Sequence, residues 1–84
     1  MGMKVILDWY DKTTEIAEGK EYSVDFGDDI SIIEVLGLTD EGKIYDGGFD
    51  VKGAWIQKLQ PLFNHKIAPA TYDYQISFRY RKTW

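Results

Sequence analysis

The chain has 84 residues, with 10 lysines and arginines against 14 aspartates and glutamates, and a formal net charge of −4 at pH 7. Its length fits a single domain, residues 1–84, and a composition of 44% hydrophobic and 15% aromatic residues excludes a disordered or collagen-like chain. The chain contains no cysteine, so it has neither disulfides nor thiolate metal ligands, and its aromatic side chains must supply much of a small core.

The first part of the sequence predicts two strands joined by a turn. Residues 3–10 alternate with the period of a strand, and their apolar face consists of Val5, Leu7 and Trp9. Residues 11–14 are typical of a turn. A second strand is expected over residues 16–26, with Gly19 indicating a bulge, and one face of that strand consists of Tyr22, Val24 and Phe26.

A short helix is predicted after the second strand. Ser31 and Glu34 have the spacing of a capping box, and Gly37 is placed to end the helix just after Leu36. Asp28 and Asp29 come before this segment, where carboxylates favour a helix N-terminus and supply too few oxygen ligands for a calcium loop. The apolar stripe of the helix is predicted to consist of Ile32, Val35 and Leu36.

The second half of the sequence predicts a loop and two further strands. Residues 38–48 contain three glycines among acids and are typical of a loop. A strand is expected over residues 48–57, Pro61 and Pro69 bracket a connection, and the last strand is expected over residues 72–81. These elements predict an α+β fold, in which a four-stranded, largely antiparallel sheet has one face covered by one short α-helix.

The pleat of the predicted strands assigns side chains to the uncovered face of the sheet. If the apolar residues of 3–10 point inward with those of the later strands, the opposite face remains open to solvent. It mixes acids with isolated aromatic residues, as protein-recognition surfaces do. This face is predicted to present Ile6, Asp8, Tyr10, Gly48, Asp50, Lys52, Asp73, Gln75 and Ser77.

Charge is divided unevenly along the chain. Residues 8–50 hold 13 acids against three lysines, a formal net charge of −10, whereas residues 51–84 carry a net charge of +5. An acidic field over half of a small protein favours a basic partner. The same acids are also compatible with a solvated surface that only keeps the protein soluble.

The sequence favours a binding protein without cofactor or metal over an enzyme. A domain this small has little room for a substrate pocket, and His65, its only histidine, has no metal or triad partner beside it. Residues 78–82 interleave aromatic and basic side chains, but alternation separates the two kinds onto opposite faces, which argues against nucleic-acid binding. No apolar stretch reaches the roughly 20 residues of a membrane span and no signal-peptide pattern occurs, so we expect an unprocessed, cytoplasmic protein.

Several short motifs in a fixed order suggest a family. They are Asp-Lys-Thr-Thr-Glu at 11–15, Glu-Tyr-Ser at 21–23, Asp-Phe-Gly-Asp-Asp at 25–29, Leu-Gly at 36–37, Phe-Asp-Val at 49–51, Leu-Gln-Pro at 59–61, Phe-Asn-His at 63–65 and Ser-Phe at 77–78, together with Trp9, Trp55, Tyr80-Arg81 and Trp84. No single motif is specific, but their order and spacing are. Over its whole length the chain resembles the immunity proteins of the ribonuclease-type colicins and cloacin.

This resemblance implies both a fold and a function. The fold would be a four-stranded antiparallel sheet with one short helix. The protein would bind the basic, ribosome-cleaving ribonuclease domain of a cognate bacteriocin beside its active cleft, and would block access to the ribosome by bulk and by repulsion of ribosomal RNA. Two alternatives stay open: an antitoxin or adaptor on the same scaffold that recognises an unrelated protein, and a small hydrolase that depends on His65.

The resemblance also places the partner-binding surface, which falls on Asp8, Tyr10, Ala17, Lys20, Gly48, Asp50, Asp73 and Gln75. Tyr10 matches an aromatic anchor, and Gly48 matches a small residue linked to discrimination between related toxins. Ala17 and Gln75 stand where the family pattern has aromatic anchors, and Lys20 stands where it has an acid. These departures imply a cognate nuclease whose surface complements them.

Overall fold

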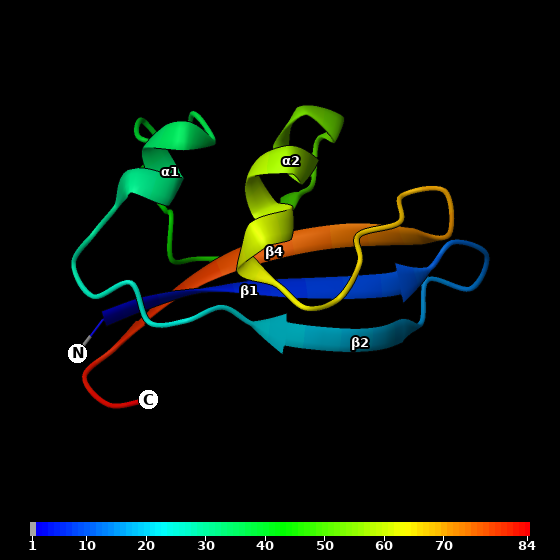
Figure 1. Cartoon of the computed structure of the whole chain (residues 1–84), viewed down its shortest axis with the longest axis horizontal. Coiled ribbons are helices and arrows are strands. Elements are labelled where there is room, and N and C mark those ends of the chain that lie inside the picture. The colour runs from blue at the N-terminus through cyan, green and yellow to red at the C-terminus, as the bar shows by residue number, and fades with distance from the viewer. Residues whose placement is uncertain (1) are drawn as a thin grey trace.

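The two longest strands form the centre of the sheet (Figure 1). In the computed structural model, which describes residues 2–84, β1 (Gly2–Asp11) pairs antiparallel with β4 (Tyr72–Arg81) along its whole length. β2 (Ala17–Tyr22) pairs with the other edge of β1, and β3 (Phe49–Asp50) pairs with the other edge of β4, which gives the order β2-β1-β4-β3. The predicted α+β fold with a four-stranded antiparallel sheet is therefore confirmed.

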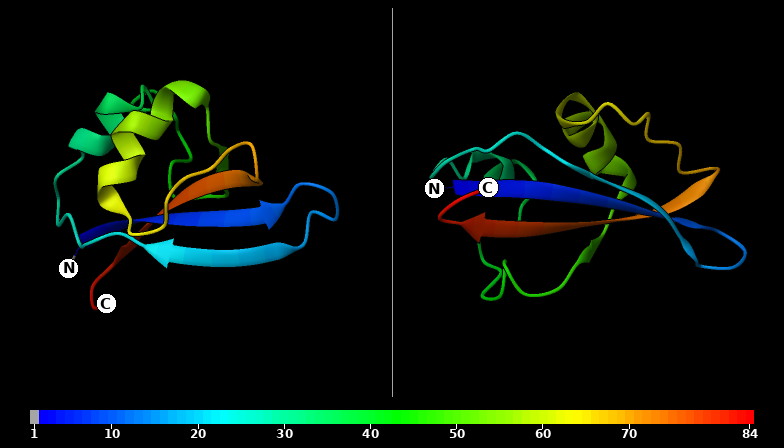
Figure 2. Two further views of the ribbon diagram at one scale, coloured as in Figure 1. Left: turned by 45° about the vertical axis from the view of Figure 1, so that its right-hand side comes forward. Right: turned by 90° about the horizontal axis from the view of Figure 1, so that it is seen from below.

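One face of the sheet carries the core. Alternation along β1 and β4 turns their apolar side chains to this face, as predicted, and Val5, Leu7, Ile76 and Phe78 are completely buried. The helical segments lie across the same face (Figure 2), and their buried residues Ile33, Trp55 and Leu59 complete the core. We call this side of the sheet the covered face and the opposite side the open face.

Strand β2 is shorter than the predicted 16–26, and its bulge lies where it was expected. Trp9 pairs with Gly19 but Tyr10 pairs with Ala17, so one extra residue of β2 bulges out of the ladder. A Cβ atom on Gly19 would lie 2.3 Å from the indole ring of Trp9, so the close approach of this ring requires glycine.

Beyond Tyr22 the alternation predicted for the second strand fails. The Ser23 hydroxyl accepts the N–H of Val5 at 2.8 Å. The Val5 N–H therefore donates to a side chain in place of a backbone carbonyl of a neighbouring strand. Ser23 is therefore buried, whereas Tyr22 and Val24 are exposed and Phe26 is half-buried against the core. The expected common face of Tyr22, Val24 and Phe26 does not form.

Helix α1 (Ser31–Val35) ends as predicted but begins differently. Gly37 has φ +75° and follows the C-cap Leu36, and backbone bonds from Gly37 to Glu34 and from Leu38 to Ile33 complete a Schellman motif. The capping box is absent, because Ser31 is already the first residue of the helix and does not cap it. The N–H of Ser31 donates to the side chain of Asp29.

The buried face of α1 differs from the predicted stripe, and Asp28 does not cap the helix. The helix is turned so that Ile33 and Leu36 are buried, while Val35 is 48% exposed and Ile32 is half-buried. Asp28 instead accepts a hydrogen bond from the Tyr80 hydroxyl, which ties the segment before α1 to β4.

The predicted strand over residues 48–57 is wrong after its first residues. β3 contains only Phe49 and Asp50, and the chain then forms three consecutive helical turns: η1 (Gly53–Trp55), α2 (Ile56–Leu59) and η2 (Gln60–Leu62). Apolar residues spaced as on a helix explain the change, because Trp55, Leu59 and Phe63 are four residues apart and all are buried. Pro61 has no N–H to continue the i→i−4 hydrogen bonding of α2, and the chain changes to the tighter turn η2 at this point.

Candidate functional site

The strand register brings the predicted partner-binding residues together on the open face. Asp8 is paired with Lys20 on β2 and with Gln75 on β4, and Gln75 is paired with Asp50 on β3. Residues paired across a sheet point to the same side, so these four form one row across all four strands. Tyr10 forms the next row with its pairing partners Ala17 and Asp73.

Gly48 joins the same surface just before β3. A Cβ atom added to Gly48 would lie 3.4 Å from the side-chain oxygen of Gln75, so Gly48 adjoins the first row. All eight residues named from the sequence therefore lie within one part of the open face. Among residues 2–84, α1 and α2 lie on the other side of the sheet from this surface (Figure 1).

The charges of this surface form ion pairs that remain exposed to solvent. Lys20 Nζ lies 3.7 Å from Asp8 Oδ1, and Lys12 Nζ lies 2.8 Å from Asp73 Oδ1. The amide of Gln75 donates to Asp50 at 3.1 Å. Exposed pairs of this kind contribute only about 0–1 kcal/mol, so a partner can exchange them for its own contacts.

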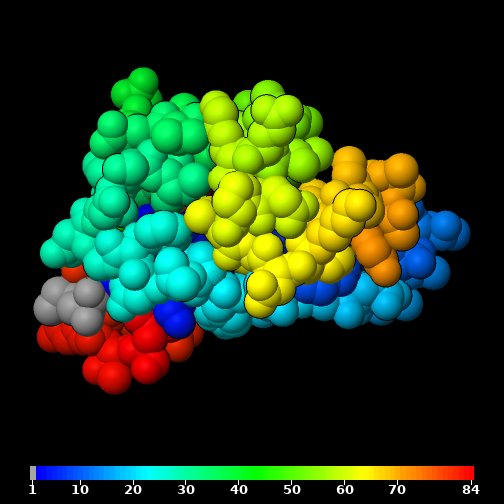
Figure 3. All heavy atoms as spheres, in the orientation of Figure 1, coloured from blue at the N-terminus to red at the C-terminus, as the bar shows by residue number. Residues whose placement is uncertain are grey.

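The other end of the open face is closed by the C-terminal residues. Trp84 donates its indole N–H to the carbonyl of Gly2 at 2.9 Å and packs edge-on against Tyr22. The Lys4 ammonium and the Arg81 guanidinium lie 4.9 and 4.8 Å from the Trp84 ring. Figure 3 shows the C-terminal residues gathered at this end of the molecule.

Two residues predicted for the open face are not presented there. Ile6 is only 4% exposed, so its side chain is not available to a partner. Lys52 follows β3 and lies over the Trp55 ring at 5.4 Å, so its side chain is directed toward the helices. The accessible part of the open face is therefore the end that carries Asp8, Asp50 and Asp73.

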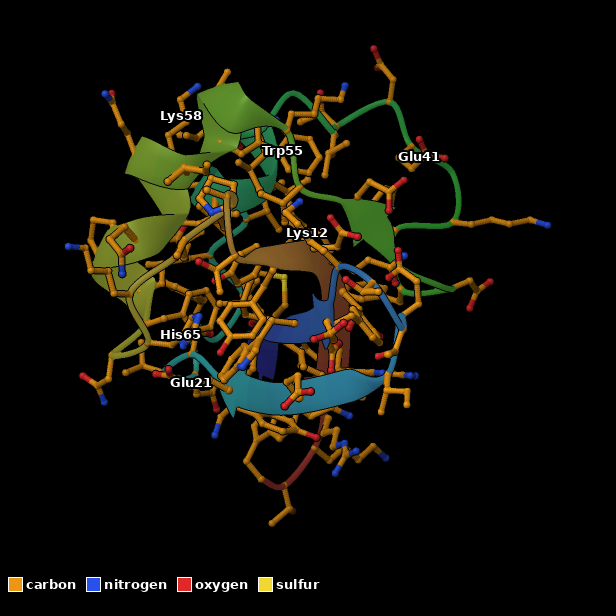
Figure 4. All side chains as sticks on the ribbon, turned by 90° about the vertical axis from the view of Figure 1, so that its right-hand side faces the viewer. Lys12, Glu21, Glu41, Trp55, Lys58 and His65 are labelled. Atoms are coloured by element: carbon orange, nitrogen blue, oxygen red, sulfur yellow. The ribbon has the colours of Figure 1, made fainter. Side chains whose placement is uncertain are left out.

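His65 lies on the covered side and serves packing. Its ring stacks on Trp9 with centroids 3.8 Å apart, and its Nε2 lies 2.7 Å from the Tyr74 hydroxyl. Burial raises the pKa of this tyrosine, whose hydroxyl also accepts the N–H of Ala68. The carboxylate of Glu21 lies beside His65 but accepts the backbone N–H groups of residues 64 and 65 (Figure 4), so it fixes the loop and not the imidazole.

Two further findings concern clusters of metal-ligating side chains and membrane-spanning helices in the described residues. Within residues 2–84, no three histidine, aspartate or glutamate side chains come together in a way that could hold a metal ion. In the same part of the chain, no helix is long and apolar enough to cross a bilayer.

A known protein family matches this chain over most of its length. The model of the cloacin immunity protein family matches residues 2–81. The chain belongs to this family. Membership in the cloacin immunity family implies immunity to a bacteriocin and binding of a cognate cloacin- or colicin-type toxin, and it confirms the resemblance drawn from the ordered motifs. The matched residues include all four strands and all helical segments of the fold.

Sequence reasoning missed part of the surface beside Tyr10. Lys12 and Glu15, on the turn after β1, lie next to Asp73 although they are far from it in sequence. Their proximity follows from the pairing of Tyr10 with Asp73, which places the turn next to the start of β4. The Asp-x-Thr-Thr pattern predicts the turn, but only the register shows what the turn contacts.

Proposed function

We propose that this immunity protein binds the cationic, ribosomal-RNA-cleaving ribonuclease domain of its cognate colicin-like toxin through the accessible end of the open face. The observation that carries the proposal is the convergence of Asp8, Asp50 and Asp73 from three strands onto a sheet face that no helix covers. The half-buried Tyr10, which pairs with Asp73 in the next row, supplies aromatic contact area of the kind that dominates protein interfaces.

Inhibition would follow from position and charge without catalysis. The bound protein would lie beside the active cleft and prevent the toxin from reaching the ribosome by bulk. Its net charge of −4 would also repel ribosomal RNA, and the excess of acids in residues 8–50 would attract a cationic domain over a distance. The encounter would take place in the cytoplasm of the producing cell, where the toxin is made.

Lys20 gives the proposed interface its specificity. Its side chain is 54% exposed, and its 3.7 Å approach to Asp8 is too long for a strong ion pair. A carboxylate on the toxin would bind Lys20 at little cost, whereas a toxin that presents a cation there would be repelled. Ala17, beside Tyr10, leaves room for a larger side chain of the partner than an aromatic residue would.

Binding and protection together test the proposal. The ribonuclease domain of a colicin-type toxin is titrated with the protein by calorimetry, and the mixture is added to a cell-free translation system. We expect tight binding at a ratio of one to one and full protection of translation. A domain that neither binds nor is inhibited overturns the proposal, and binding to an unrelated protein would support an antitoxin or adaptor instead.

The partner surface is tested by a matched pair of charge variants. Asp8→Asn and Asp50→Asn remove acids from the accessible end of the open face, and Asp40→Asn removes an acid from the loop 38–48. We expect the first two to weaken binding and the third to leave it within about twofold. Equal losses for all three would mean that net charge alone, and not this face, accounts for binding.

A further inference from the structure

A hollow lies at the edge of the proposed interface. It has a volume of about 630 Å³ and opens where β4 begins, between the turn after β1 and the helical turns η1 and α2. Four of the residues proposed for partner binding line it, namely Tyr10, Asp50, Asp73 and Gln75. The hollow is therefore continuous with the open face, and Lys12, which also lines it, lies beside the start of β4 (Figure 4).

The walls of the hollow combine apolar surface with carboxylates. Val51, Ile56 and Tyr72 line it and are each half-buried. Glu15, Asp50 and Asp73 supply three carboxylates, against which Lys12 is the one cation in the lining. Such a combination suits a long side chain with an aliphatic stem and a positively charged end.

Glu15 is held toward this hollow by an unfavourable backbone conformation. Its φ is +57°, and among residues 2–84 it is the one non-glycine residue with a positive φ. The turn enforces this conformation, because Asp11 Oδ1 accepts the N–H groups of Thr13 and Thr14 while the Asp11 carbonyl accepts that of Glu15. Backbone conformations of this kind concentrate at functional sites.

The two carboxyl groups at the rim influence each other. A hydrogen bond with Asp73 raises the pKa of the Glu15 carboxyl above its ordinary value. The ammonium of Lys12, 2.8 Å from Asp73, lowers the pKa of that aspartate. Lys12 thus pairs with Asp73 and not with Glu15, and a second cation beside Glu15 would reduce the repulsion between the two acids.

We propose that this hollow receives one arginine or lysine side chain of the toxin, with its cationic end between Glu15 and Asp73 and its stem against Val51, Ile56 and Tyr72. This inference rests on the proposed function, because the occupant belongs to the ribonuclease domain. It assigns a role to Glu15 and Ile56, which lie outside the eight residues predicted from the sequence.

A glycine in the lining allows the hollow to be filled. An added Cβ at Gly53 would meet no atom within 4 Å, and its backbone is not left-handed, so Gly53→Trp places a large side chain at the hollow without strain. Gly42 has the same properties but lies on the loop 38–48, and Gly42→Trp is the matched control. Circular dichroism and thermal unfolding are the controls for the fold, and we expect both variants to keep it.

The first measurement is the affinity of each variant for the ribonuclease domain. We expect Gly53→Trp to bind about tenfold more weakly or worse, and Gly42→Trp to bind within about twofold of the unchanged protein. Glu15→Gly should also bind more weakly while unfolding at the same or a higher temperature, since glycine relieves the positive φ. Unchanged affinity of Gly53→Trp or of Glu15→Gly overturns the proposal.

A second measurement separates this inference from the proposed function. N-acetylarginine methylamide is titrated into the protein, and the NMR signals of Val51 and Ile56 are followed. We expect saturable shifts in the unchanged protein and in Gly42→Trp, and none in Gly53→Trp. If the toxin domain does not bind but these shifts occur, the proposed function fails and the cation site stands; if the shifts are absent, the cation site is refuted.

Discussion

Truncating two aromatic residues on opposite sides of the sheet should separate folding from binding. Trp55 is 5% exposed within the core, and replacing a buried tryptophan with alanine costs about 3–5 kcal/mol. At roughly 0.05–0.15 kcal/mol per residue, the 84-residue domain has a total stability of about 4–13 kcal/mol. Trp55→Ala therefore removes a large share of the stability and should lower Tm by at least about 12 °C.

Tyr10→Ala should have the opposite effect. Tyr10 is half-buried on the open face, so its removal leaves the core intact and should change Tm by only a few degrees. Loss of an aromatic anchor typically costs about 1–3 kcal/mol of binding, which is a 5- to 150-fold weaker Kd.

Thermal unfolding by circular dichroism and calorimetric titration with the ribonuclease domain measure the two effects on the same samples. If Tyr10→Ala unfolds the protein while Trp55→Ala, tested below its lowered Tm, only weakens binding, the assignment of the two faces is wrong. If both variants fold and bind normally, neither residue has the role assigned to it.

Four further outcomes are expected. The association rate with the toxin, followed by stopped-flow fluorescence, should fall steeply between about 50 and 500 mM salt; a flat response would exclude electrostatic attraction. Glu21→Gln should lower the free energy of unfolding by about 1–3 kcal/mol in urea titrations, because one of two backbone N–H groups would then face an amide donor. Gly19→Ala should destabilise by about 1–3 kcal/mol through contact with the Trp9 ring, whereas Gly42→Ala, in open space, should not. Hydrogen bonds donated by Thr14 and Thr13 lower the pKa of Asp11 below 3.8. The contribution of Asp11 to stability is therefore present above about pH 4 and is lost as the pH falls through the lowered pKa. Asp11→Asn should flatten the dependence of the free energy of unfolding on pH in this acidic range.

The central strands could be predicted from the sequence because their pattern is long. In β1 and β4, alternation continues for eight or more residues, and one face is uniformly apolar, which leaves little choice of structure. The segment after β3 was ambiguous. Phe49, Val51 and Trp55 continue a period of two, while Trp55 also begins the four-residue spacing that leads through Leu59 to Phe63, and burial of this helical face decided the outcome.

The site was predictable to the extent that the pleat alone determines it. Alternation and family resemblance placed Asp8, Tyr10 and Gln75 on one face, but neither shows which residues of different strands are neighbours. The register depends on the pairing of β1 with β4 across most of the chain, and the bulge in β2 shifts Ala17 opposite Tyr10. The contact between Glu15 and Asp73 depends on this register and on the turn between β1 and β2, so it could not be predicted from the local sequence.

Pairing of the first strand with the last has a consequence for the order of folding. Gly2 is opposite Arg81, 79 positions later, and β4 lies between β1 and β3 in the sheet. A nascent chain therefore cannot assemble the sheet until β4 has left the ribosome exit tunnel, and contacts at such long sequence separation also slow folding. Unlike modular proteins that fold piece by piece, this one should become protective in a single late step, and a chain that stops before β4 should give no partial activity.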